Sequence, residues 1–189
     1  MSFDKLAHFI MLGRSAVRDV DALRTTVPQT ALLISDTIDL AEVLPEDSRD
    51  AAKAGVTYQL FFVFEAYLRD LVLTVLSEAK KEAWWDAVPG NVRDDVSKLE
   101  EHEDRKKWMN LDSRGKLSLT TLPQLLSIID DPTNWKSYFE AVVRDKQLIQ
   151  QTRLVVHTRN TVCHMSQVTD EEHERVQQVL RDWFRIVAP

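Results

Sequence analysis

The sequence has 189 residues, a length that favours a single domain. Its 24 Lys and Arg face 30 Asp and Glu, for a net charge of −6. This balance argues against an extended, non-specific nucleic-acid-binding surface and leaves room only for a small basic cleft. Four glycines and six prolines argue against a many-stranded β protein and favour long helices. The single cysteine excludes an internal disulfide and a cysteine-based zinc site, and it favours a reducing compartment.

Hydropathy gives no sign of a targeting or membrane segment. Residues 1–5 lack the basic start and apolar run of a signal peptide. The most apolar stretch, residues 54–76, is interrupted by Glu65, Arg69 and Asp70, so it cannot supply the roughly 18 apolar residues of a membrane span. We therefore expect a cytoplasmic protein without a membrane partner.

The N-terminal part of the chain predicts two helices. Apolar side chains recur at helical spacing over residues 3–23. After Pro28, a second helical stretch is expected from about 29 to 44, ending before a proline. We expect residues 1–45 to be an N-terminal helical extension packed on a bundle formed by residues 46–189.

The strongest predicted element is a central core helix over residues 56–81, which contains no Gly or Pro and carries an apolar stripe that includes Phe61 and Phe64. A mixed-charge segment, residues 93–108, is predicted to be a helix with a solvated face. Further helices are expected over residues 117–129, 133–144 and 145–165. A capping box at Thr169 begins a final amphipathic helix. The predicted fold is therefore an all-α bundle.

Two charged side chains lie within apolar stripes. With Leu148 at 0° on a helical wheel, Val155 falls at about 340° and Arg159 at about 20°. In the central helix, Glu65 lies at about 40° from Phe61, inside the apolar stripe. Because an unpaired buried charge is costly, we infer that Glu65 and Arg159 are neighbours. The alternatives are a purely structural ion pair, or a surface pair of Glu65 with the arginine four residues later.

The opposite face of the late helix is polar and basic. Arg153, His157, Asn160 and His164 fall between about 120° and 180° on the same wheel. Residues 144–165 hold four Lys and Arg against one Asp, a local charge of +3 in a chain of −6. Positive charge is therefore concentrated on this helix.

A known motif covers the end of this helix. The segment Arg159-Asn160-Thr161-Val162-Cys163-His164 resembles the R-x4-6-H motif of HEPN domains, in the form with a polar residue directly after the Arg. Upstream, residues 61–69 (FFVFEAYLR) resemble the aromatic helix with an embedded acid found early in many HEPN domains. The pair Trp84-Trp85 resembles the Swt1-like branch of that superfamily. The resemblance covers about residues 50–188.

The resemblance implies a helical bundle that dimerises, so that two motifs, one from each chain, line a single cleft. Family members that are enzymes cut RNA without a metal, and they occur as toxins and as effectors of antiphage defence and CRISPR systems. Many other members have lost activity and serve as binding modules. The expected function is therefore a metal-independent endoribonuclease without a cofactor, and the alternative is a non-catalytic module that binds a partner protein or RNA.

The residue types of the motif suit RNA cleavage by the neighbouring 2′-OH. His164 can act as base or acid near neutral pH, Arg159 can stabilise charge on the phosphorane, and Asn160 can orient the imidazole or a phosphate oxygen. Glu65 is expected to support the arginine, while Arg153 and His157 would line the outer part of the cleft and contact RNA.

One angle conflicts with a site in a single chain. Arg159 and His164 lie about 140° apart on a regular helix, so both reach one site only if the helix distorts or if the site straddles a two-fold axis. We favour the homodimer, because an isologous interface brings two copies of one patch together.

Three other features bear on how the activity is controlled and on whether the cysteine or a metal takes part. Ser166 replaces the Tyr of the R-x4-H-x-Y variant, which makes control by nucleotide transfer to that Tyr doubtful. Cys163 lies on the apolar stripe and is expected in the core. A zinc site from His157, Cys163, His164 and His173 lacks ligand spacing. An RNase of this kind should need a trigger, or an antitoxin or regulatory protein as partner.

Overall fold

A computed structural model describes residues 31–106, 108 and 115–187. The described residues fall into two compact units, divided after Lys53. The helix predicted over residues 3–23 lies outside the described residues. The expectation that residues 1–45 pack on the bundle as an extension stays a prediction.

The first described elements form a small hairpin rather than a helix. β1 (Leu33–Ser35) pairs antiparallel with β2 (Ile38–Asp39), and the short helix α2 (Leu40–Val43) follows. Over the described part of the helix predicted from about 29 to 44, the prediction is therefore wrong at the two strands and correct at α2.

A single carboxylate explains this local fold. The Asp39 side chain accepts hydrogen bonds from the backbone N–H groups of Leu32, at 2.9 Å, and of Ala41, at 2.8 Å. It thus closes the hairpin and caps α2 at the same time. The β-branched residues Ile34 and Ile38 favour the extended backbone in the strands.

The long helix α3 (Pro45–Lys80) begins with a proline and two acidic residues in its first turn, as the N-terminal end of a helix favours. Within the second unit its buried side chains recur three or four residues apart: Phe61, Phe64, Leu68, Val72 and Leu76. The predicted central core helix is confirmed, and it begins earlier than expected.

The elements after α3 build the remainder of the bundle. They are the 3-10 helix η1 (Lys81–Ala87), α4 (Gly90–Asp104), the 3-10 turn η3 (Lys116–Leu119), α5 (Leu122–Asp130), α6 (Pro132–Asn134), the π-helical η4 (Trp135–Phe139), α7 (Glu140–Val143), α8 (Gln147–Cys163) and α9 (Asp170–Ile186). The helix predicted over residues 117–129 is divided, because Thr121 forms a capping box that starts a new helix. The Thr169 cap is confirmed, since its side chain accepts a hydrogen bond from the Glu172 N–H.

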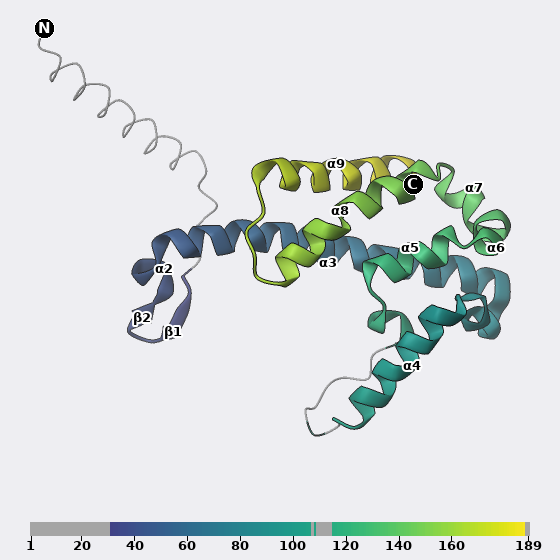
Figure 1. Ribbon diagram of the computed structural model, residues 1–189, viewed down its shortest axis with the longest axis horizontal. Helices are drawn as coiled ribbons and strands as arrows, with labels where there is room; N and C mark the ends of the chain where they lie inside the picture. The colour runs from purple at the N-terminus through teal and green to yellow at the C-terminus, as the bar shows by residue number, and fades with distance from the viewer. Residues whose placement is uncertain (1–30, 107, 109–114, 188–189) are drawn as a thin grey trace, which may run out of the picture. The chain divides into compact units, whose positions relative to one another are not determined.

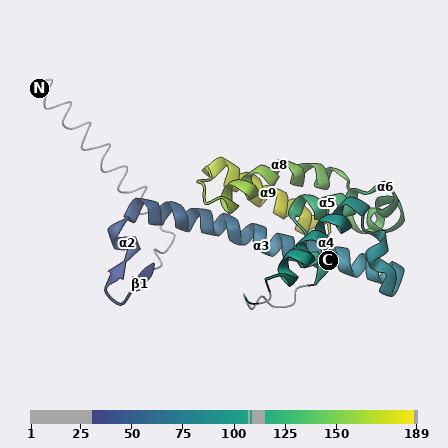
Figure 2. The same ribbon diagram turned by 60° about the horizontal axis from the view of Figure 1, so that its bottom comes forward.

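Trp183 of α9 contacts both α3 and α8. Its ring is fully buried and lies 5.7 Å, centroid to centroid, from Phe64 of α3. Its indole N–H donates to the Thr152 hydroxyl of α8 at 2.6 Å, so the polar group of a buried ring is satisfied. Helices α8 and α9 consequently run side by side along α3, as both views show (Figures 1 and 2). None of the described helices combines the length and apolar character needed to cross a membrane.

Candidate active site

Glu65 lies between two arginines. One carboxylate oxygen accepts a hydrogen bond from Arg159 Nε at 2.8 Å, and the other accepts one from Arg69 Nη2, also at 2.8 Å. The predicted contact of Glu65 with Arg159 is confirmed. The alternative pair with Arg69 forms as well, because the carboxylate has two oxygens and each binds one guanidinium.

The charges of this cluster do not cancel. Two guanidinium groups and one carboxylate leave a charge of +1. The Glu65 residue is 6% exposed, and the Arg159 side chain is 24% exposed. Burial lowers the pKa of Arg159, but the hydrogen bond and the charge of Glu65 outweigh burial and raise the pKa above its usual value. Arg159 therefore remains a cation at every physiological pH.

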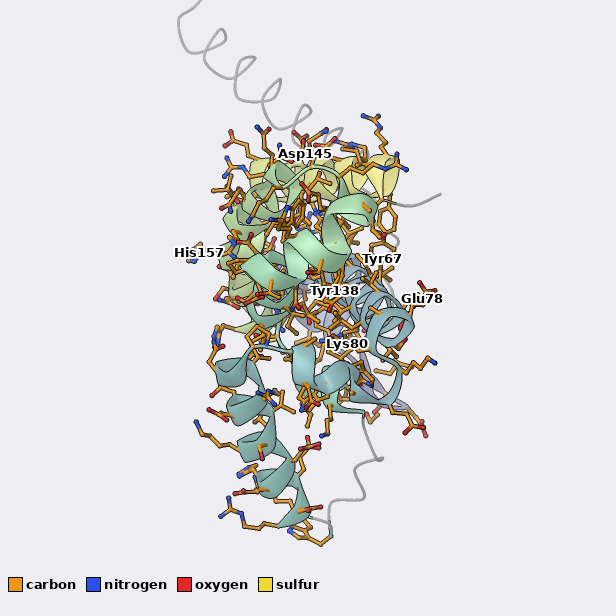
Figure 3. The ribbon with its side chains drawn as sticks, turned by 90° about the vertical axis from the view of Figure 1, so that its right-hand side faces the viewer. Tyr67, Glu78, Lys80, Tyr138, Asp145 and His157 are labelled. Carbon is orange, nitrogen blue, oxygen red and sulfur yellow. The ribbon has the colours of Figure 1, made fainter. Side chains whose placement is uncertain are left out.

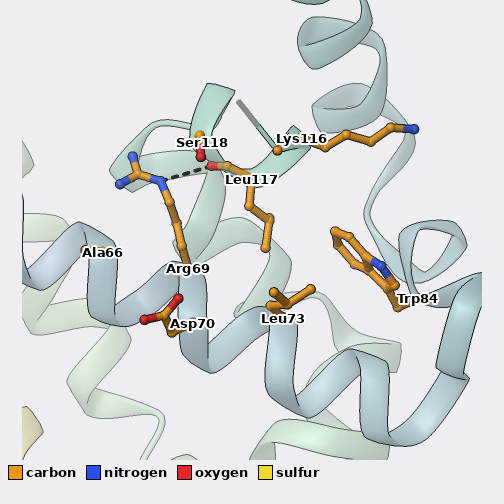
Figure 4. Close-up of a pocket in the computed structure, with 9 residues that line it drawn as sticks. Ala66, Arg69, Asp70, Leu73, Trp84, Lys116, Leu117 and Ser118 are labelled. Atoms are coloured by element: carbon orange, nitrogen blue, oxygen red, sulfur yellow. Dashed lines mark hydrogen bonds between the residues drawn. The ribbon is translucent and has the colours of Figure 1, made fainter. Parts of the chain in front are cut away.

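Arg69 also binds the backbone of residues 117–120, the segment of η3 and its C-terminal end that lies against α3. Its Nε donates to the Leu117 carbonyl at 2.9 Å, and its Nη2 donates to the Thr120 carbonyl, also at 2.9 Å. Figure 4 shows the first of these bonds, with Ser118 beside it. One side chain thus holds both the Glu65 carboxylate and the backbone of η3 in place.

A cavity of about 390 Å³ opens beside this cluster. Its wall includes the Glu65, Arg69 and Arg159 cluster together with Cys163 and the aromatic residues Tyr58, Phe61 and Phe62. The prediction of a buried core cysteine is wrong, since Cys163 is exposed. The reason is that the apolar stripe of α8 is covered along the helix but faces the cavity at its C-terminal end.

His164 occupies a different environment from Arg159. It is the residue that ends α8, its side chain is exposed, and it is not part of the cavity wall. Its backbone N–H closes the last turn on Asn160 O at 3.0 Å, and Met165 follows with a φ of 57°. Asn160 is exposed as well. One chain therefore does not bring the arginine and the histidine of the motif to one cavity.

The two outer residues of the polar face also lie apart from the cavity. Arg153 donates to a carboxylate oxygen of Asp130 at 2.8 Å, and Lys146 contacts the other oxygen at 2.8 Å. His157 is exposed, and its side chain points away from the bundle (Figure 3). Both residues share the outer face of α8 with His164, as the wheel predicted.

Tyr58 and Phe62 were not predicted as site residues, although the sequence places them beside the charged cluster. On the wheel that places Glu65 at about 40°, Tyr58 falls at about 60°, Arg69 at about 80° and Phe62 at about 100°. Tyr58 and Phe62 are 49% and 63% exposed, and their rings lie 6.2 Å apart. The two neighbouring rings form an exposed apolar patch beside the charged cluster, and contiguous patches of this kind are where ligands and partners bind.

No group of three or more His, Cys, Asp or Glu among the described residues is arranged to hold a metal ion. Of the histidines considered for zinc, His173 lies on α9 between Thr57 and Gln177. Its Nδ1 is 2.7 Å from the threonine hydroxyl, and its Nε2 is 2.9 Å from the glutamine amide nitrogen. This histidine joins α9 to α3.

The bundle and the position of the arginine–histidine motif at the end of the penultimate helix define an all-α HEPN-like fold. The sequence model of the Swt1-like HEPN family matches residues 59–188, so the chain belongs to that family. Comparisons with curated proteins and with solved structures gave no match. The predicted family and branch are both confirmed.

Proposed function

We propose that the chain is a metal-independent endoribonuclease of HEPN type whose site is composed of two copies of the chain. The observation that carries the proposal is the anchoring of Arg159. Its Nε binds Glu65, which leaves the two terminal nitrogens of the guanidinium without a hydrogen bond to any described residue. A cation held in one orientation at a cavity is suited to bind a phosphate.

The proposed reaction needs no group beyond the chain and the RNA. His164 takes the proton of the 2′-OH, and the 2′ oxygen attacks the phosphorus. The bond from phosphorus to the 5′ oxygen then breaks, and an imidazolium gives the leaving oxygen its proton. The products are a 2′,3′-cyclic phosphate and a 5′-OH end. Arg159 stabilises the extra negative charge of the phosphorane, and Asn160 orients the imidazole.

A second copy is part of the proposal because of the geometry of α8. Arg159 faces the cavity and His164 faces solvent at the end of the helix. If α8 helices meet at a two-fold axis, the histidine of one copy can approach the arginine of the other. Arg153 and His157 would then border the RNA. A toxin or antiphage-defence effector, restrained by an antitoxin or regulatory protein, is the biological role that fits such an activity.

The test is cleavage of single-stranded RNA by purified protein in excess EDTA. We expect wild type to produce 2′,3′-cyclic phosphate ends and to leave DNA of the same sequence intact, since DNA lacks the nucleophile. His164→Ala should lower cutting by roughly 10²- to 10⁴-fold. His102→Ala is the matched control, because His102 is an exposed histidine in the last turn of another helix, α4. Cleavage that requires magnesium, or that keeps its wild-type rate in His164→Ala, would contradict the proposal.

A second candidate is a non-catalytic interaction module. The observation that favours it is the exposed pair of aromatic rings on α3, Tyr58 and Phe62, whose centroids lie 6.2 Å apart. Absence of cleavage of any RNA, together with capture of a partner protein that depends on Phe62, would support the module instead.

A further inference from the structure

One face of α3 carries a continuous row of exposed or cavity-lining residues. The row is Tyr58, Phe62, Ala66, Arg69, Asp70 and Leu73. Residues spaced three or four apart lie on one side of a helix, and this row spans about 22 Å along the axis. Helix faces inside a bundle are normally covered, so a row of this length that the described residues leave open is a candidate binding surface.

Two cavities open along this row and share a wall. The first is the cavity of about 390 Å³ that contains Arg159, and the second has a volume of about 330 Å³. Arg69 and Ser118 line both. The two cavities therefore adjoin at Arg69 and Ser118, and together they are here called the α3 groove.

The second cavity has one apolar end and one polar end. Trp84, Leu73 and Leu117 gather at the apolar end, and the Arg69 guanidinium lies at the other (Figure 4). The neighbouring ring of Trp85 is covered by the Lys116 ammonium, 5.1 Å from its centroid. The Lys116 ammonium therefore lies over Trp85, next to the cavity that Trp84 and Lys116 line.

The charge of the α3 groove is opposite in sign to that of the chain. Its walls carry three cations, Arg69, Lys116 and Arg159, against two carboxylates, Glu65 and Asp70. The groove is therefore +1, whereas the whole chain is −6. This difference favours an anionic occupant with flat apolar parts over an apolar peptide.

We propose that the second cavity is a nucleobase subsite for single-stranded RNA, with the base against Trp84 and the adjoining phosphate at Arg69 and Ser118. The inference rests on the proposed function, which places the scissile phosphate at Arg159. Arg69 has one terminal nitrogen, Nη1, that makes no hydrogen bond to a described residue. Stacking on an aromatic ring tolerates any base, so the groove selects an unpaired strand rather than a sequence. Trp84 and Lys116 bind substrate here and take no part in the bond changes.

The test compares variants at the second cavity with matched variants elsewhere. We expect Trp84→Ala and Lys116→Glu each to raise the KM for a single-stranded RNA by about 10-fold in EDTA, with kcat unchanged. Binding of the same RNA to the His164→Ala chain, measured by fluorescence anisotropy, should weaken by a similar factor when either substitution is added. Trp108→Ala and Lys98→Glu are the controls, because Trp108 is 79% exposed and the Lys98 side chain is 74% exposed, and neither lines the groove.

Each outcome bears on one of the two proposals. If RNA is cut but the groove variants keep the KM and affinity of the controls, the subsite is overturned and the ribonuclease stands. If nothing is cut but RNA binding depends on Trp84 and Lys116, the subsite stands and the ribonuclease is overturned. If no RNA binds, the groove is not an RNA site and a protein partner is the better occupant. Because Trp84 also packs on the core, Lys116→Glu decides the result if Trp84→Ala does not fold.

Discussion

The two ends of the motif differ more than their distance along α8 suggests. Arg159 is held by a carboxylate that is itself held by Arg69, and Arg69 in turn binds two backbone carbonyls. His164 ends the helix, is exposed, and its ring makes no hydrogen bond to any described residue. The arginine is oriented by its own chain before any ligand arrives. The histidine needs a second copy of the chain or the substrate to fix its position.

The largest expected effects are losses of RNA cleavage at His164 and Arg159, and only the Arg159 variant should also lose stability. His164→Ala should lower RNA cleavage by roughly 10²- to 10⁴-fold and leave the free energy of unfolding unchanged, because His164 is exposed and its ring makes no hydrogen bond to a described residue. Arg159→Ala should lower cleavage by a comparable roughly 10²- to 10³-fold and also reduce stability. Cleavage rates and urea unfolding of the same preparations check both statements. Equal stability losses in the two variants would contradict the statement that Arg159, but not His164, is held by its own chain.

The second expected effect tests whether the two ends meet across a dimer. Arg159→Ala and His164→Ala chains, each inactive alone, are mixed and allowed to exchange subunits. A site that takes Arg159 from one copy and His164 from the other is then restored in half of each mixed dimer. An equimolar mixture should recover about a quarter of wild-type activity. No recovery, with dimers shown by light scattering, would place both residues of a site on one chain.

The third expected effect is a loss of folding stability when the Glu65 cluster is broken. Glu65→Ala leaves two guanidinium groups facing each other and should cost about 3 kcal/mol, near the lower end of the range for a broken buried pair because both arginine side chains are partly exposed. This corresponds to a melting temperature lower by about 6–12 °C. Arg159→Ala should cost only about 1 kcal/mol, since Glu65 keeps Arg69. Glu78→Ala, at an exposed position of the same helix, is the control, and an equal loss there would contradict the assignment.

The smallest expected effect is a change in how stability depends on alkaline pH, and it is caused by the partly buried Tyr67. Burial raises the pKa of Tyr67 above 10.0, and its ring packs 4.9 Å from Phe184. A raised pKa in the folded state gives stability that is fully present below about pH 10 and is lost as the pH rises through the higher value. The urea concentration at the unfolding midpoint should therefore fall less with rising alkaline pH in Tyr67→Phe than in the wild type. Tyr58→Phe, at an exposed ring, should leave the loss unchanged.

The contact between Glu65 and Arg159 could be predicted because each charge interrupts an apolar stripe, and a buried charge requires a partner. Two other features could not be predicted in this way. The bonds from Arg69 to the carbonyls of residues 117 and 120 leave no trace in side-chain pattern, since every residue has a carbonyl. A helical wheel gave the direction of Cys163 but not the place where the covering helices end, so an exposed residue was expected in the core.

Residues 33–39 illustrate a different limit. The strands are too short to show an alternating pattern, and their apolar residues fit a helical period equally well. The Asp39 carboxylate decides between the two structures by binding N–H groups on both sides of itself. Such bonds depend on the turn that they stabilise, so they are visible only once the backbone is known.

The exposed position of Cys163 has a practical consequence for spectroscopy. It is the only cysteine of the chain, and it lines the Arg159 cavity. A maleimide fluorophore or nitroxide would therefore label one defined atom per chain with no background from other thiols. In a two-fold assembly the labels form a single symmetric pair, so one distance distribution from electron spin resonance would report how far apart the two cavities lie, and how that separation changes when an oligonucleotide is added.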